Sequence, residues 1–306
     1  MTLDGGGVID GQGHAWWWAS DAGSPAAKQR PDMIQPALVN GLTLRDLTFR
    51  ASPNWSVHPL LCTDVLASNI RIESGQFDQD GEYQGHNVDG FDPDSCTGVV
   101  LENSVINAGD DCVAIYSVRG PTSDVVVRNV TCHTPLSITH GNWGTSDVLF
   151  EDCTVRGDWG GDHTYKPRWW KTALRLKSDR HTNGTLQNIA YRNINAIGVD
   201  LLFDIQMWYP CQNQSGMANY DLCRSMAHPK PEPGIRPHIR NVSLVNVTGE
   251  GAWRTGWLNC LPESPCKEVS VEGVVAEGAL PWECEHVEGA AKGGNAPPAD
   301  GCFVQW

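Results

Sequence analysis

Short segments with one recurring arrangement of polar and apolar residues follow one another along the chain. Each segment reads polar, apolar, any, apolar, any, polar, apolar, so its apolar positions alternate with a period of two. That period is typical of a β-strand with one buried face. The copies begin at Gly41, Asn69, Gly98, Asp124, Asp147, Asn188, Asn241 and Glu268.

The spacing of these copies predicts how the strands are connected. Successive starts lie 28, 29, 26, 23, 41, 53 and 27 residues apart. An interval in the twenties is too short for a strand–helix–strand crossover each time, and it is typical of a parallel β-solenoid. We therefore predict an all-β chain, with loops inserted near residues 157–170 and 208–238, where the two long intervals fall.

Composition favours one turn-rich β domain over residues 1–306. The chain has 32 Gly, 19 Pro and 40% hydrophobic residues, and it has no linker or low-complexity run at which to divide it. No run of 18 apolar residues is present, so we expect no membrane partner. The net charge of −14 argues against a nucleic-acid partner, because phosphate neutralisation needs excess Lys and Arg. A few local cations could still bind a polyanionic substrate.

The 11 cysteines indicate an oxidising compartment. Proximity along the chain favours the disulfides Cys211–Cys223, Cys260–Cys266, Cys284–Cys302 and, as a further candidate, Cys96–Cys112. The alternative is buried free thiols, and the spacing of Cys112, Cys132 and Cys153 would let them stack inside successive coils.

Asn-x-Ser/Thr sequons add to the expectation of a secreted, extracellular glycoprotein. They start at Asn54, Asn129, Asn183, Asn213, Asn241 and Asn246. The chain opens at Met1-Thr-Leu-Asp without a basic and apolar leader. We therefore expect either that a signal was removed or that the N-terminus is shortened.

Three aspartates form the candidate catalytic group. Asp89 lies in Asn87-Val-Asp-Gly-Phe-Asp-Pro-Asp-Ser-Cys96, and Asp110 and Asp111 follow one coil later in Ala108-Gly-Asp-Asp-Cys112. Adjacent coils are about 4.8 Å apart, and carboxylates that close cannot all remain ionised. One of them should therefore have a raised pKa and serve as an acid beside carboxylates that activate water, as glycoside hydrolysis requires. The alternative is structural, since Asx residues often mark turns and strand caps.

Several segments, in this order, resemble glycoside hydrolase family 28, the polygalacturonase family. Each is weakly specific alone, and together they cover most of the chain up to about residue 210. They are Gly6-Gly-Val-Ile-Asp-Gly-Gln-Gly13 with Trp16-Trp17, Ser52-Pro-Asn-Trp-Ser-Val-His-Pro59, Asn87–Cys96, Gly109-Asp-Asp-Cys-Val-Ala-Ile115 and Arg175-Leu-Lys177.

The resemblance implies a right-handed parallel β-helix, a pectin-lyase-like solenoid, that hydrolyses α-linked galacturonan in pectin with inversion and without metal or cofactor. Asp110 would be the general acid, and Asp89 and Asp111 the bases that activate water. Arg175 and Lys177 would bind the substrate carboxylate, which a guanidinium can hold in a bidentate way. We expect a monomer that acts on pectic polysaccharide or oligogalacturonides.

The histidine segment departs from the family pattern. The family has Gly-His-Gly before a Leu-Ser-Ile type strand, whereas this chain has Cys132-His-Thr-Pro-Leu-Ser-Ile138. Strict alignment puts Thr134 at the histidine position, so His133 would complete the site only if the turn is displaced. His140 is a second candidate, and it remains open that neither histidine serves. The substrate therefore also stays open to xylogalacturonan or rhamnogalacturonan, although the Asp110–Asp111 pair favours the polygalacturonase-like alternative.

The start of the chain and its aromatic residues add two expectations. Family members carry another coil and a cap before the Gly-Val-Ile-Asp-Gly segment, so the N-terminal cap is expected to be missing and one solenoid end exposed. Trp208 follows a strand and is the best candidate for stacking on a sugar ring, with core packing as the alternative. If the inserted loops close one end of the groove, cleavage would be exo.

Two other functions remain open. A pectate lyase would need calcium and an arginine base, and Asp92 and Asp94 could be calcium ligands, but the motif order does not fit that family. A catalytically impaired solenoid would bind polysaccharide without cleaving it.

Overall fold

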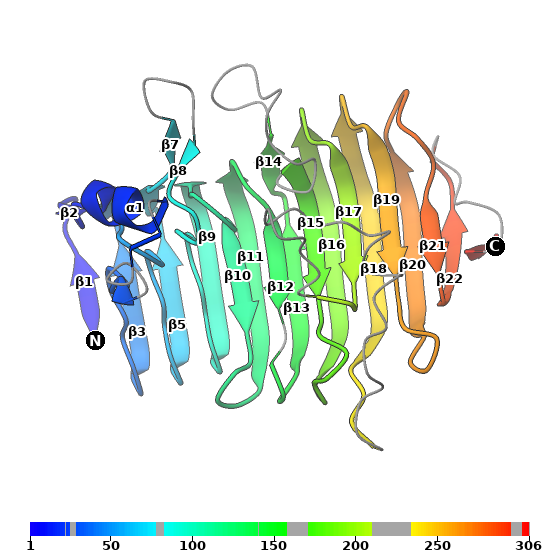
Figure 1. Ribbon diagram of the computed structural model, residues 1–306, viewed down its shortest axis with the longest axis horizontal. Coiled ribbons are helices and arrows are strands. Elements are labelled where there is room, and N and C mark those ends of the chain that lie inside the picture. Colours follow the sequence, from blue (N-terminus) through cyan, green and yellow to red (C-terminus); the bar gives the residue numbers. More distant parts are fainter. Residues whose placement is uncertain are drawn as a thin grey trace.

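The computed structural model describes residues 1–21, 23–24, 29–77, 83–139, 141–157, 171–209, 234–294 and 302–305. The strands in these ranges stack in successive coils along one axis (Figure 1). Within the described ranges, strand pairing is parallel except for one small hairpin. The predicted all-β parallel solenoid is confirmed. The predicted loops at 157–170 and 208–238 lie almost wholly outside the described residues.

The larger of the two sheets contains the strands that the repeat predicted. Its strands are β1 (Thr2–Asp4), β2 (Val8–Asp10), β3 (Asn40–Arg45), β4 (Thr48–Arg50), β5 (Thr63–Ser68), β6 (Arg71–Glu73), β9 (Thr97–Asn107), β11 (Thr122–Cys132), β13 (Thr145–Glu151), β14 (Thr154–Arg156), β16 (Thr185–Ile197), β18 (His238–Glu250), β20 (Cys266–Val275), β22 (Val287–Lys292) and β23 (Phe303–Gln305).

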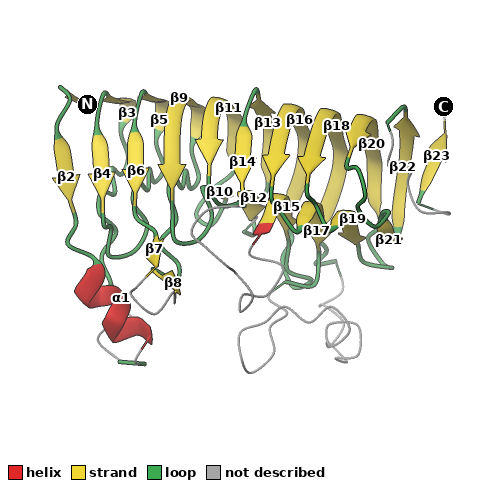
Figure 2. Ribbon diagram, turned by 90° about the horizontal axis from the view of Figure 1, so that it is seen from above, coloured by secondary structure: helices red, strands yellow, loops and turns green. Residues whose placement is uncertain are grey.

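A second, six-stranded sheet forms the opposite wall of the solenoid and lies below the larger sheet in Figure 2. Its strands are β10 (Val113–Tyr116), β12 (Leu136–Thr139), β15 (Thr172–Lys177), β17 (Leu201–Gln206), β19 (Arg254–Asn259) and β21 (Glu283–Glu285). The hairpin of β7 (Gln76–Phe77) and β8 (Tyr83–Gln84) and the helix α1 (His14–Asp21) project from the N-terminal coils. No described helix is both long enough and apolar enough to cross a membrane.

The solenoid core consists of apolar side chains stacked in register from coil to coil. Val99, Val125, Val148, Ile189 and Val242 occupy successive positions of one such row, and each is at most 2% exposed. Full burial of a side chain of this size contributes about 1.5–3 kcal/mol. The alternating pattern that predicted the strands is therefore the pattern that builds the core.

The polar residues of the repeat also bend the chain. Asn188, Asn193, Asn241 and Asn246 all have φ between 52° and 57°, in the left-handed region that Asn tolerates better than most residues. Their side chains stack in ladders, since Asn241 Nδ2 donates to Asn188 Oδ1 at 2.8 Å and Asn246 Nδ2 donates to Asn193 Oδ1 at 2.9 Å. These bends lie in β16 and β18, and the ladders hold these two adjacent coils in register.

The disulfides confirm two predicted pairs and correct a third. Cys260–Cys266 and Cys284–Cys302 are bonded as expected, whereas Cys211 and Cys223 lie outside the described residues.

The predicted Cys96–Cys112 pair is wrong. Cys112 is bonded to Cys132, with Cα atoms 5.7 Å apart, and Cys96 is a buried free thiol, as are Cys62 and Cys153. Cys96 precedes β9 and Cys112 follows it, so the length of β9 separates these two cysteines. Cys132 is the last residue of the adjacent parallel strand β11, and it therefore lies at the same end of the sheet as Cys112.

Replacement of Cys132 by Ala should lower the free energy of unfolding by about 3 kcal/mol, because the bond closes a loop between residues 20 apart. Urea denaturation of this variant and the wild type would measure the loss. Disulfide mapping should find Cys112 linked to Cys132 and Cys96 open to alkylation. A mapped Cys96–Cys112 peptide would contradict the arrangement.

Candidate active site

The outer face of the six-stranded sheet is polar, because its strands alternate apolar side chains toward the core with polar ones away from it. Register pairing aligns these outer positions in rows across the coils. One row is Ala114, Ser137, Arg175, Asp204 and Trp257, and the next is Tyr116, Thr139, Lys177, Gln206 and Asn259. Arg175 and Lys177 therefore point to the same side, as their alternate positions predicted.

The turns that enter this sheet bring the three predicted aspartates together. The Gly90 backbone N–H donates to the Asp111 carbonyl at 2.9 Å, and the Asp110 N–H donates to the Val88 carbonyl at 3.1 Å. A Cβ at Gly109 would lie 2.0 Å from the Gly85 carbonyl oxygen, so only glycine allows this close approach. Two successive coils thus carry Asp89, Asp110 and Asp111 into one small area.

Asp111 is the carboxylate that the surrounding cations hold. Its side chain is 1% exposed, and it accepts hydrogen bonds from Lys177 Nζ at 2.5 Å, Ser137 Oγ at 2.7 Å and Arg175 Nη1 at 3.4 Å. Burial by itself would raise the pKa of Asp111, but the charges of Lys177 and Arg175 and these hydrogen bonds lower it below its ordinary value. Among the three aspartates, Asp111 is therefore the one whose surroundings favour the ionised form.

Asp110 and Asp89 have the opposite electrostatic environment. Burial, followed by the negative charge of Asp111, raises the pKa of Asp110 to about 6, although Lys177 and Arg175 offset part of the shift. Burial and the charges of Asp110 and Asp111 raise the pKa of Asp89 well above its ordinary value. Asn87 Nδ2 donates to Asp110 Oδ2 at 3.3 Å. Both Asp110 and Asp89 therefore favour the protonated form, and the role of Asp110 as the acid stays a prediction.

Two further buried carboxyls were not predicted as part of this site. Asp92 is wholly buried, neither carboxyl oxygen has a hydrogen-bond partner, and burial followed by the charge of Asp89 raises its pKa. Asp204 on β17 is also wholly buried, with Oδ2 3.8 Å from Arg175 Nε. Asp92 could have been identified from the sequence, because it lies three residues after Asp89 in the same motif. For Asp204 the only signal was its polar side chain inside an apolar strand.

One of the two candidate histidines, His133, lies within the described residues. His133 lines a cavity of about 380 Å³ on the outer face of the larger sheet, together with His14, Arg50 and Arg71. Val113 pairs with Leu136, and Asp111 and Thr134 each lie two residues before these positions. Thr134 is therefore in register with Asp111. His140 lies outside the described residues. A catalytic role of either histidine stays a prediction.

The aromatic candidate Trp208 is half-buried and packs against the hydrophobic core. Arg180 Cζ lies 4.8 Å from the centre of its ring, which is a cation–π contact. The neighbouring Tyr209, which was not predicted, has its ring centre 5.4 Å from Lys177 Nζ. Stacking of Trp208 on a sugar stays a prediction.

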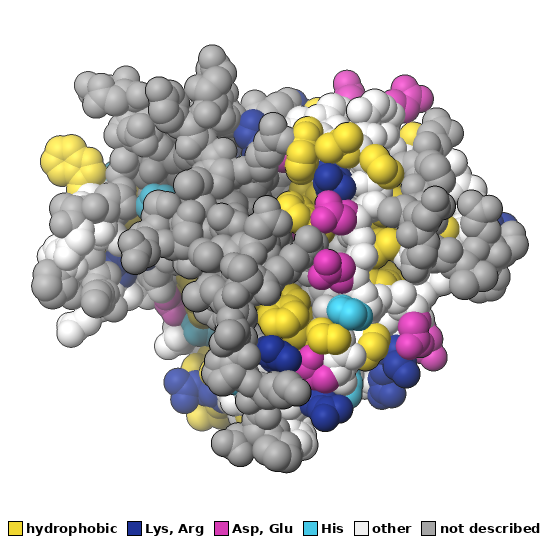
Figure 3. Space-filling view, turned by 45° about the vertical axis from the view of Figure 1, so that its right-hand side comes forward, with side chains coloured by type: hydrophobic (Ala, Val, Ile, Leu, Met, Phe, Trp, Pro, Cys, Tyr) yellow, Lys and Arg dark blue, Asp and Glu magenta, His cyan; other side chains and the backbone are white. Residues whose placement is uncertain are grey.

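On the part of the face in Figure 3 that is not grey, charged side chains of both signs lie near one another. Asp94, considered above as a calcium ligand, instead fastens a turn, since its Oδ1 accepts from Ser95 Oγ at 2.7 Å and from the Val118 N–H at 2.9 Å. Among the described residues, no group of three or more His, Cys, Asp or Glu side chains is arranged to hold a metal ion.

The raised carboxyl pKa values predict that the protein is more stable at pH 5 than at pH 7. A carboxyl with a raised pKa in the folded state binds more protons there than in the unfolded state, so stability falls as pH rises toward the folded-state pKa, about 6 for Asp110. The pKa of Asp111 is lowered, so this group makes stability fall as pH decreases, but only at pH values below its ordinary pKa. Thermal unfolding should therefore show a higher midpoint at pH 5, and an equal or lower midpoint would contradict this electrostatic arrangement.

Comparison with known families places this site in context. Residues 1–293 match Glycosyl hydrolases family 28. The chain belongs to this family. The predicted resemblance is thus confirmed over nearly the whole chain, beyond its expected limit at about residue 210.

Curated relatives of this family-28 chain carry polygalacturonase names. A probable polygalacturonase of Vitis vinifera is 26% identical over 95% of this chain and 56% of the relative. A probable endopolygalacturonase D of Neosartorya fischeri is 28% identical over 94% and 57%, and an exopolygalacturonase of Cochliobolus carbonum is 24% identical over 94% and 64%. The chain therefore spans a little over half the length of the first two.

Solved structures confirm the predicted right-handed parallel β-helix. The family-28 chain superposes on a hyperthermoactive exopolygalacturonase from Thermotoga maritima with a TM-score of 0.73 and 20% identity, covering 97% of this chain and 70% of that one. The polygalacturonase from Erwinia carotovora ssp. carotovora gives a TM-score of 0.72 at 22% identity, with 94% and 70% covered.

Proposed function

We propose that this family-28 chain hydrolyses α-linked galacturonic-acid-containing pectin with inversion at the anomeric carbon. The observation that supports this most is the division of protonation between adjacent aspartates. The pKa of Asp110 is raised to about 6, while that of Asp111 is lowered. An acid and an ionised carboxylate side by side are what glycoside hydrolysis uses.

In this proposal Asp110 protonates the leaving glycosidic oxygen, and Asp89 and Asp111 activate a water on the opposite face of the sugar ring. Asp110 is half-buried whereas Asp89 and Asp111 are buried, so Asp110 is the most accessible of the three. Each turnover leaves Asp110 ionised and the base protonated, and transfer of this proton back to Asp110 restores the starting state.

Arg175 and Lys177 are the proposed cations for the galacturonate carboxylate. Both are buried on the outer face of the six-stranded sheet, with 4% and 5% exposure, and both contact Asp111. A guanidinium has five N–H donors and an ammonium has three, so contact with Asp111 leaves donors for a substrate anion. A substrate bound there would lie directly beside the proposed acid and bases.

The relatives support the substrate class, since polygalacturonase is the activity in their names, in both endo and exo forms. One solved relative is an endopolygalacturonase I from Stereum purpureum complexed with two galacturonates. We propose a secreted monomer with one domain over residues 1–306 and no metal or cofactor. For its mode of cleavage we propose exo, and the sizes of the products decide between exo and endo.

Product analysis tests the proposal. The protein is incubated with polygalacturonic acid, xylogalacturonan and rhamnogalacturonan, with EDTA present throughout. Saturated galacturonate as the main product would support exo hydrolysis, and a ladder of saturated oligomers would support endo hydrolysis. Unsaturated products would indicate a lyase. Cleavage of xylogalacturonan or rhamnogalacturonan alone would identify that polysaccharide as the substrate in place of polygalacturonic acid. Binding without release of reducing ends would identify an inactive binder.

A further inference from the structure

Tyr116 is a residue of the outer sheet face to which the proposed mechanism gives no role. It ends β10, in register with Asp94 on the preceding coil and Thr139 on the next. Its ring stacks on that of Trp55, with centroids 4.9 Å apart and planes at 19°. The Tyr116 side chain therefore leans across a full coil toward Trp55.

Trp55 lies in the same row across the coils as two of the aspartates. Val57 pairs with Phe91, which in turn pairs with Val113. Trp55, Asp89 and Asp111 each lie two residues before one of these paired positions. The three residues therefore form one row across successive coils. A ring that rises from Tyr116 and stacks on Trp55 must therefore cross the outer face toward the row of Asp89 and Asp111.

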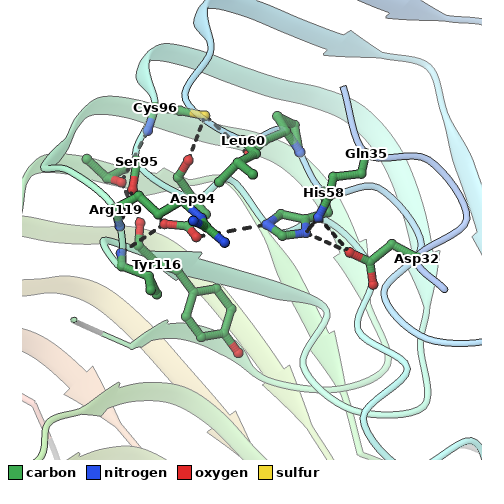
Figure 4. A network of polar contacts seen from close by, with 12 residues as sticks. Asp32, Gln35, His58, Leu60, Asp94, Ser95, Cys96, Tyr116 and Arg119 are labelled. Carbon is green, nitrogen blue, oxygen red and sulfur yellow. Dashed lines mark hydrogen bonds and ion pairs between the residues drawn. The ribbon is translucent and has the colours of Figure 1, made fainter. Parts of the chain in front are cut away.

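A polar network fixes this arrangement (Figure 4). His58 Nδ1 lies 2.7 Å from Asp32 Oδ2. The Trp55 ring meets the His58 ring edge-on, with centroids 4.7 Å apart. On the other side, Asp94 Oδ1 accepts the Val118 N–H and so fastens the turn that follows Tyr116. Figure 4 shows the Tyr116 hydroxyl at the end of the ring farthest from this turn.

Hydrogen-bond donors are unequally distributed among the buried carboxyls. Asp111 takes those of Lys177, Ser137 and Arg175, as described above. Asp89 Oδ1 and both oxygens of Asp92 are buried without a hydrogen-bond partner. Within the described part of the chain, the Tyr116 hydroxyl makes no hydrogen bond either, and after burial the charge of Asp89 is the largest cause of the raised pKa of Tyr116.

We propose that Tyr116 is a positioning residue of the hydrolytic site, whose hydroxyl donates a hydrogen bond to the Asp89 carboxylate through one water. This inference rests on the proposed function. A hydrogen bond to the charged form favours that form, so it would keep Asp89 ionised as a base in acid solution. Burial and the surrounding aspartates raise the pKa of Tyr116, which keeps the hydroxyl protonated and able to donate.

Replacement of Tyr116 by Phe isolates this effect, because it removes one oxygen and retains the stacked ring. It alters none of the titratable or charged groups that surround Tyr116 and Asp89. Those groups are Asp32, His58, Asp92, Asp94, Asp110, Asp111, Arg175 and Lys177.

The first measurement is the pH dependence of kcat/KM on polygalacturonic acid. In Tyr116→Phe the acid limb should move upward by about one pH unit, which is about a tenfold loss of kcat/KM below that limb. The matched control is Tyr191→Phe, since Tyr191 is wholly buried between Phe150 and Phe203 and its hydroxyl has no partner. Tyr191→Phe should leave the limb in place. An unchanged or lowered limb in Tyr116→Phe would overturn the proposal.

A second measurement does not depend on activity. Unfolding midpoints at pH 5 are compared for wild type, Tyr116→Phe, Asp89→Ala and the double variant. Loss of the hydroxyl should lower the midpoint when Asp89 is present and leave it unchanged when Asp89 is absent. An equal change in both backgrounds refutes the role of Tyr116, even in a protein inactive on pectin. Coupling in a protein that cleaves no pectic substrate would refute the proposed function alone.

Discussion

The Asp110→Asn protein is expected to hydrolyse polygalacturonic acid about 10²–10⁴-fold more slowly than wild type, because the amide cannot protonate the leaving oxygen. The loss should appear in kcat, since Asn retains the size of Asp and leaves the contacts of Arg175 and Lys177 with Asp111 in place. Release of reducing ends under substrate saturation measures it.

Two controls make this result specific. Asp64→Asn changes an exposed carboxyl at a left-handed position that Asn tolerates, and it should retain wild-type activity. Asp110→Asn should also unfold at a higher temperature than wild type at pH 7, because it removes a half-buried carboxyl whose pKa is raised. Activity within tenfold of wild type in Asp110→Asn would remove Asp110 as the acid.

Replacement of Lys177 by Met should destabilise the protein by about 3–5 kcal/mol at pH 7, since it leaves the buried Asp111 without its shortest ion-pair contact. The loss should become smaller as pH falls, because an Asp111 carboxyl without Lys177 is neutralised by protonation at higher pH than in the wild type. Urea denaturation at pH 7 and pH 4 measures both effects.

Lys292 provides the matched control for this change. Its side chain is 65% exposed and its Nζ lies 3.5 Å from Glu272, so Lys292→Met should cost less than about 0.5 kcal/mol. Addition of Asp111→Asn to Lys177→Met should recover much of the stability, because the uncompensated charge is then gone. A Lys177→Met protein as stable as Lys292→Met would show that the buried pair contributes little.

The repeat and the aspartate motif were predictable because each depends on local order in the chain. A strand with one buried face requires apolar residues at every second position. The strands that contain Val99 and Val125 could therefore be identified from the alternation in the sequence. The grouping of Asp89 with Asp110 follows from the length of one coil, which the spacing of the copies already fixes.

The partner of Cys112 could not be chosen from the sequence. Cys96 is closer along the chain, but proximity along the chain takes no account of the strand that intervenes. Cys132 lies at the same end of the adjacent strand, and only the register between β9 and β11 shows this. The direction of the His133 side chain could not be predicted from the sequence either. A displacement of one residue along a strand moves a side chain to the other face of the sheet.

The protonation of the site was also decided by tertiary structure. From the sequence, one raised pKa was expected among three aspartates, but burial also raises the pKa of Asp89 and Asp92, while Lys177 and Arg175 select Asp111 as the ionised group. The sequence by itself determined the all-β solenoid, the strand positions and which carboxyls meet, because these follow from periodicity and coil length. Tertiary structure decided which carboxyl is ionised, which cysteine is bonded and where Tyr116 points, because these depend on burial and on contacts between residues far apart in the chain.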